Sequence, residues 1–176
     1  MLYTQETINK TIIMKRFVLI MFAMLTITTT SSAQEIYYEI KHKAQANVSD
    51  PSTNPLVKQF SMFKIEALNY LAIKMKEEMP DSSATLLDKE ALSLNTFLTI
   101  YTNALVESSQ MPPAHQMKII SAFMDASYEN PLFNDPDKEL VLAFFKNGES
   151  LTRFSLDTDW RRAVLAANEA LKRLKK

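Results

Sequence analysis

The chain has 176 residues, a formal net charge of zero, one glycine and no cysteine. Tight β-hairpins, phosphate-binding loops and nucleophile elbows depend on glycine, so its near absence argues against all three. A neutral chain gives no electrostatic reason to expect binding to nucleic acid. Helix-forming residues are plentiful, and the length suits one domain. We therefore expect a single-domain, all-α bundle of five or six helices.

The N-terminal residues have the pattern of an export signal. Lys15 and Arg16 precede an apolar run, residues 17–27, which is shorter than a membrane span needs. Small residues follow as far as Ala33, as in the cleavage region of a signal peptide. The alternative interpretation is an uncleaved N-terminal membrane anchor.

This pattern divides the chain into two parts. We predict that residues 1–33 are an upstream extension and a signal peptide, with Met14 a candidate true start, and that residues 34–176 form the helical domain. An exported chain without cysteine has neither disulfides nor the lipid-modified cysteine of a bacterial lipoprotein. We expect a soluble periplasmic or secreted protein whose mature chain does not insert stably into a membrane.

Residues 35–48 predict a short first helix, and residues 54–79 predict a long helix at the centre of the fold. Asn54 suits the N-cap of the long helix, Pro55 suits its first position and Pro80 ends it. Its apolar residues recur at steps of three and four, the period of one helical face. They are Leu56, Phe60, Phe63, Ala67, Leu71 and Met75. A helix this apolar needs cover from more than one side.

Two further helices are predicted over residues 83–109 and 113–128. The first packs antiparallel to the long helix, because the turn between them is short. Its predicted seam is Leu87, Ala91, Leu94, Leu98, Tyr101 and Leu105. The second carries inward-facing apolar residues that include Met117 and Phe123. The methionines at positions 62, 75, 79, 111, 117 and 124 are interpreted as core fillers.

The C-terminal part predicts a short fifth helix and a last helix. Asp135 caps the fifth helix, which ends at Asn147 and Gly148. Residues 151–156 are expected to be extended or irregular. Asp157 or Thr158 caps the last helix, whose inner stripe begins at Trp160. A tetratricopeptide-like array is only a minor alternative, because the two longest helices are too long to belong to a two-helix unit of about 34 residues.

Three stretches resemble an uncharacterised family of small exported all-helical proteins of Gram-negative bacteria. They are the signal segment ending in Ala33 and Gln34, the phrase KIEALNYLAIK, and the tail FNDPDKELVLAFF…FSLDTDW. The resemblance covers most of the mature chain. It implies an exported helical protein and lends no catalytic residues, because no activity is assigned to that family.

The sequence offers no specific catalytic or metal-binding motif. His42 and His115 lie on different predicted helices without a second ligand at helical spacing. Asp135, Asp137 and Glu139 alternate, but a step of two on a helix points neighbours to opposite faces, so calcium binding is not expected. We predict no metal, no cofactor and no catalytic residue that can be assigned from the sequence.

One segment concentrates aromatic and acidic residues, and it has two interpretations. The candidate interaction surface consists of Phe133, Asp135, Phe154, Asp157, Asp159 and Trp160. In the first interpretation these aromatics plug the open end of the bundle, since large aromatics dominate core burial. In the second they stay exposed beside the acids and recognise a partner.

The function expected from these observations is non-enzymatic. The leading hypothesis is a protein-binding or structural protein of the cell envelope, with an envelope protein as its unidentified partner and no nucleic acid. One alternative is a carrier for a small apolar ligand, in a cavity lined by Phe and Met side chains. The other is an enzyme whose site cannot be read from the sequence.

Overall fold

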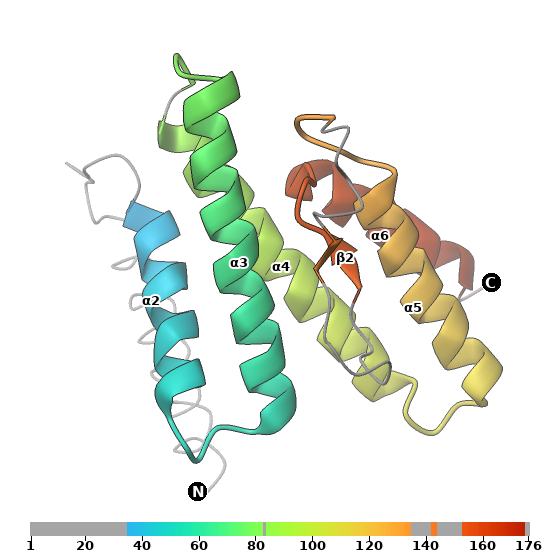
Figure 1. Ribbon diagram of the computed structural model, residues 1–176. Coiled ribbons are helices and arrows are strands. Elements are labelled where there is room, and N and C mark those ends of the chain that lie inside the picture. Colours follow the sequence, from blue (N-terminus) through green and yellow to red (C-terminus); the bar gives the residue numbers. More distant parts are fainter. Residues whose placement is uncertain (1–34, 83, 135–141, 144–152, 175–176) are drawn as a thin grey trace, which may run out of the picture. The chain divides into compact units, whose positions relative to one another are not determined.

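The computed structural model describes residues 35–82, 84–134, 142–143 and 153–174, which all belong to one compact unit, Ala33–Lys176. The predicted export signal lies outside these ranges. The described part is all-α, as predicted, with five helices that are shown in Figure 1. They are α2 (Glu35–Ser49), α3 (Pro55–Glu78), α4 (Ala84–Glu107), α5 (Pro113–Tyr128) and α6 (Trp160–Leu174). None of these helices combines the length and apolarity that a membrane crossing requires.

Helix α4 is the element around which the others are arranged. Helices α2 and α3 form an antiparallel pair that packs against α4, and α5 and α6 pack against α4 and against each other (Figure 1). The start of α3 follows the sequence prediction, because Oδ1 of Asn54 accepts a hydrogen bond from the amide of Leu56 at 2.9 Å and Pro55 is the first helical residue.

The predicted seams of α3 and α4 are largely confirmed. Five of the six apolar residues predicted on α3 are buried, and Leu56 is the exception at 37% exposed. On α4 the predicted seam is buried apart from Leu105, which packs at the edge of the core. The same face of α4 also buries Phe97 and the carboxyl group of Glu90, neither of which was predicted there.

An aromatic cluster joins the elements at the centre of the core. The ring of Phe97 lies 5.3 Å from that of Trp160, 5.2 Å from that of Phe154 and 5.2 Å from that of Phe123, in edge-to-face arrangements. The ring of Phe63 also contacts Phe154 and Trp160, at 5.6 and 5.9 Å. These contacts connect α3, α4, α5 and α6, and edge-to-face pairs add to the energy of burial.

The interpretation of the methionines as core fillers is wrong for three of them. Met62, Met111 and Met117 are 47%, 50% and 60% exposed, whereas Met75 is buried. Ile119, two residues after Met117, is buried on α5 in its place. The inner face of α5 is thus turned relative to the predicted one.

The predicted fifth helix is contradicted where the structure describes it. Leu142–Ala143 form strand β1, which pairs antiparallel with strand β2, Phe154–Ser155, with Leu142 opposite Ser155 and Ala143 opposite Phe154. A long-range backbone pairing has overridden a helical pattern here, as tertiary context often does. The extended conformation predicted at residues 151–156 is confirmed at β2, whereas Asp135, Asn147 and Gly148 lie outside the described residues.

Candidate functional site

The segment predicted as an interaction surface is largely buried. Phe154, Asp157 and Trp160 are fully buried, and Phe133 and Asp159 are partly buried. The sixth candidate, Asp135, lies outside the described residues. Because Phe154 and Trp160 are part of the aromatic cluster, their placement agrees with the plug interpretation. A recognition surface made from these side chains would require them to leave the core.

The side chains of Asp157 and Asp159 both accept hydrogen bonds from backbone amides. One side-chain oxygen of Asp157 accepts hydrogen bonds from the amides of Leu132 and Phe133, at 3.0 and 2.7 Å. Oδ1 of Asp159 accepts one from the amide of Arg162 at 3.0 Å, so Asp159 is the N-cap of α6. The prediction that Asp157 or Thr158 caps this helix is therefore wrong.

A buried carboxyl group on α4 also contacts the start of α6. Oε2 of Glu90 accepts a hydrogen bond from the backbone amide of Trp160 at 2.8 Å. Helix starts leave amides without intrahelical acceptors, so this carboxyl group serves as a second cap, supplied by another helix. Among the described residues, Oε1 of Glu90 and Nε1 of Trp160 have no hydrogen-bond partner.

The environment of Glu90 favours its neutral form. Burial, and to a lesser extent the negative charge of Asp159, raise the pKa of Glu90 from 4.5 to about 7. The hydrogen bond from Trp160 and the charge of Arg161 act in the opposite direction. Carboxyl groups with raised pKa values are frequent in active sites. The carboxyl group of Glu90, however, is buried in the core and contacts the start of α6, which indicates a structural role.

A groove lies between α5 and α6. These helices run antiparallel, because the amide of Asp159 donates to the carbonyl of Asn130 at 2.8 Å and so places the start of α6 beside the end of α5. The groove has a volume of about 820 Å³. Alanines make up much of its lining, namely Ala114, Ala122, Ala126, Ala166 and Ala170. We call it the α5–α6 groove.

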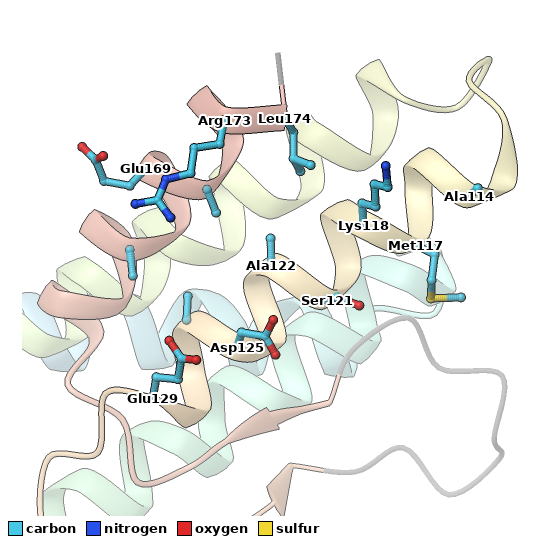
Figure 2. A pocket seen from close by; sticks show the side chains of 13 residues that line it. Ala114, Met117, Lys118, Ser121, Ala122, Asp125, Glu129, Glu169, Arg173 and Leu174 are labelled. Atoms are coloured by element: carbon cyan, nitrogen blue, oxygen red, sulfur yellow. The ribbon is translucent and has the colours of Figure 1, made fainter. Parts of the chain in front are cut away.

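Charged side chains surround this alanine surface (Figure 2). On α5, Lys118 lies toward the N-terminal end, and Asp125 and Glu129 lie toward the C-terminal end. On α6, Glu169 and Arg173 complete the charged lining. This groove was not predicted from the sequence. The sequence pattern that could have indicated the groove is a spacing of four between alanines, which places them on one face of a helix. This spacing occurs at Ala122 and Ala126 on α5 and at Ala166 and Ala170 on α6.

A second hollow of about 580 Å³ lies where α4, the start of α5 and the end of α6 meet. Its lining combines apolar side chains, such as Ile100, Ile119 and Leu171, with five polar ones. The polar residues are Asn103, Glu107, Ser108, His115 and Asn168. Of the two histidines, His42 is exposed on α2. The described residues contain no group of three His, Cys, Asp or Glu side chains suited to a metal ion.

Comparison with protein-family models, with curated proteins and with solved structures gives no significant match. The family resemblance stated from the sequence therefore stays a prediction.

The plug interpretation predicts a large loss of stability for Phe154→Ala. Removing a fully buried ring from the aromatic cluster should lower the free energy of unfolding by roughly 3–5 kcal/mol in chemical denaturation. Phe133→Ala is the matched control, because Phe133 is only partly buried and its ring lies 6.1 Å from that of Tyr70. We expect a clearly smaller loss there. Equal losses in the two variants would contradict a central role for Phe154.

Glu90 predicts a pH dependence of stability with a definite sign. Because its pKa is higher in the folded chain, its neutral form stabilises the fold fully below pH 4.5, and this contribution is lost as the pH rises through about 7. The loss amounts to roughly 3 kcal/mol at most.

Denaturant titrations from acid to neutral pH should therefore show this decline in the wild type and not in Glu90→Gln, which keeps an oxygen acceptor for Trp160. Glu77→Gln, at an exposed position of α3, should decline as the wild type does. Parallel curves for the wild type and Glu90→Gln would show that Glu90 does not titrate in this range.

Proposed function

We propose that this chain is an exported, non-enzymatic protein of the cell envelope that binds another protein through the α5–α6 groove. The observation that carries this proposal is the groove itself, which combines an alanine-rich surface with charges on both helices. Small side chains allow a third helix to approach a pair of helices closely, and surrounding charges set its orientation.

The composition of the groove favours a protein over a small apolar ligand. Five of its thirteen lining residues are charged, and such a lining is unlike the mainly apolar walls of carrier cavities. A protein interface, in contrast, typically has an apolar centre and a polar rim. The groove has this arrangement, with Ala122 and Ala126 flanked by Lys118 and Asp125.

A carrier for a small ligand is the second candidate, and the second hollow favours it. Its volume of about 580 Å³ lies within the usual range for small-molecule sites, and its lining combines apolar with polar side chains. The apolar part of the wall comes from Ile, Leu and Ala side chains with Met111, rather than from the Phe and Met residues expected from the sequence.

Mass measurement of the native protein tests the export proposal and the carrier alternative together. We expect a denatured mass for a chain that begins at Gln34, or at its pyroglutamate form, recovered from the periplasm or the medium. Under native conditions the carrier alternative predicts an additional bound small molecule. A mature chain that retains residues 17–27 would contradict export by a cleaved signal.

Site-specific photo-crosslinking tests the groove. Ser121 is exposed, has a small side chain and lines the groove (Figure 2). A photo-reactive amino acid at position 121 should crosslink to a protein in intact cells, whereas the same group at Glu66, exposed on α3, should not give that product. Asp125→Lys should reduce the yield at position 121. Identical products from both positions would contradict binding in the groove.

A further inference from the structure

We propose that proton release from Glu90 loosens the start of α6 from α4, and that the α5–α6 groove consequently binds its protein partner more weakly as the pH rises above neutral. This inference rests on the proposed function and names how that function is regulated. It follows from the contacts that hold the first residues of α6.

Two consecutive amides fix the start of α6 to two different parts of the fold. The amide of Asp159 donates a hydrogen bond to the carbonyl of Asn130, just beyond the end of α5, at 2.8 Å. The next amide, that of Trp160, donates to Oε2 of Glu90 on α4, also at 2.8 Å. The first contact places α6 beside α5, and the second places it against α4. The spacing of α5 and α6 along the groove therefore depends on both.

The anchor of this segment to α5 is made by uncharged groups. Oγ of Ser127 on α5 lies 3.1 Å from Oγ1 of Thr158, and the same Oγ1 lies 2.9 Å from the carbonyl oxygen of Ser155. The amide of Ser155 also donates to Oγ of Ser127 at 2.8 Å. All three residues are buried. Hydroxyl and carbonyl groups do not ionise near neutral pH, so this anchor is insensitive to pH.

The contact with α4, in contrast, depends on a titratable group. Glu90 is 1% exposed, and its Oε1 atom has no hydrogen-bond partner among the described residues. A neutral carboxyl group is tolerated in such a place, whereas a negative charge with one unpartnered oxygen is costly. Water relieves this cost when the start of α6 moves away from α4. Because burial raises the pKa of Glu90 to about 7, this change falls near neutral pH.

Neighbouring charges do not compensate a negative charge on Glu90. Asp159 raises its pKa, and Arg161 lowers it to a smaller extent. No cation forms an ion pair with Glu90 in the described part of the chain. Charged groups of the other packed elements bond elsewhere or are exposed. They are Asp88 with the amide of Tyr37, Lys64 with Asn95, Asp157 with the amides of Leu132 and Phe133, and the exposed Lys118 and Asp125 of α5.

The first residue of α6 supplies much of the apolar area that this helix buries. The ring of Trp160 lies 5.9 Å from that of Phe63 and 5.3 Å from that of Phe97, whereas the other fully buried residues of α6 are Ala163 and Ala167. Alanine buries little apolar surface. If the first turn leaves α4 while Thr158 stays anchored to α5, α6 tilts about its start. Its distance from α5 then changes along the groove.

Hydrogen exchange of the purified full chain, followed by mass spectrometry from acid to mildly alkaline pH, tests this opening. A carboxyl group with a pKa of about 7 in the closed state and 4.5 in the open state changes the opening equilibrium by up to roughly 300-fold. After correction for intrinsic exchange, protection at the start of α6 should fall by up to that factor. Helix α2, which packs against α3 and α4, is the internal control and should keep its protection. Acrylamide quenching of Trp160, the single tryptophan, should increase over the same pH range.

Three substitutions separate an electrostatic role of Glu90 from a purely structural one. Glu90→Gln keeps an acceptor for Trp160 and should retain protection of α6 at every pH. Asp159→Asn keeps a good N-cap but removes a negative charge, so the midpoint of the opening should move to lower pH. Arg161→Gln removes a positive charge and should move the midpoint to higher pH. Glu77→Gln, exposed on α3, should behave as the wild type.

Crosslinking from position 121, in cell envelopes buffered at acid or alkaline pH, connects the opening to the groove. The yield should fall at alkaline pH in the wild type and stay constant in Glu90→Gln. Protection of α6 that is independent of pH, an equal loss in α2 and α6, or a crosslinking yield that does not follow the opening would overturn the proposal. Absence of the crosslink at every pH, with pH-dependent protection of α6, would contradict binding in the groove and support the role of Glu90.

Discussion

The packing of aromatic rings around Phe97 is the interaction on which the rest of this fold depends. Phe97 comes from the central helix, and its ring contacts Phe123 of α5, Phe154 of β2 and Trp160 of α6. With no cysteine in the chain, no disulfide adds to this packing. The cluster also fixes where α5 and α6 lie relative to α4, and thus determines the groove between them.

Polar groups also stabilise the packing of the start of α6 against α4, beside the aromatic cluster. Burying the start of α6 removes its first amides from water, and an unpaired buried amide is costly. The hydrogen bond from the amide of Trp160 to Glu90 satisfies one of these donors, and Asp159 satisfies that of Arg162. The raised pKa of Glu90 reflects the burial that this arrangement requires. A group that resembles a catalytic carboxyl is here explained by the capping of a buried helix.

Helix periodicity was enough to predict the fold class and most of the core. The seam of α4 and the start of α3 at Asn54 follow from local spacing and capping preferences, which depend on nearby residues only. The burial of Glu90 could also have been predicted. Glu90 lies three residues after Leu87 and four before Leu94, which places it on the apolar face. A charged residue at such a position indicates a buried polar contact.

Other features depend on contacts between distant parts of the chain and were not predictable in this way. The strand pairing of Leu142 with Ser155 replaces a locally plausible helix. The exposure of Met117 depends on how α5 is rotated against its neighbours, which apolar spacing alone does not determine. The α5–α6 groove arises from two helices separated by 31 residues in sequence (129–159), so neither helix alone reveals it.

The long sequence separation of the central contacts has a consequence for the order of folding. Trp160 pairs with Glu90 across 70 residues, and its ring fills the space between Phe63 and Phe97. The N-terminal helices therefore cannot complete a core until the last part of the chain is present. Contacts between residues so far apart in sequence are slow to form, because a long loop must be closed first. A chain that crosses a membrane N-terminus first, as we propose for this one, would remain unfolded during the crossing and would close its core once its C-terminal helix arrives.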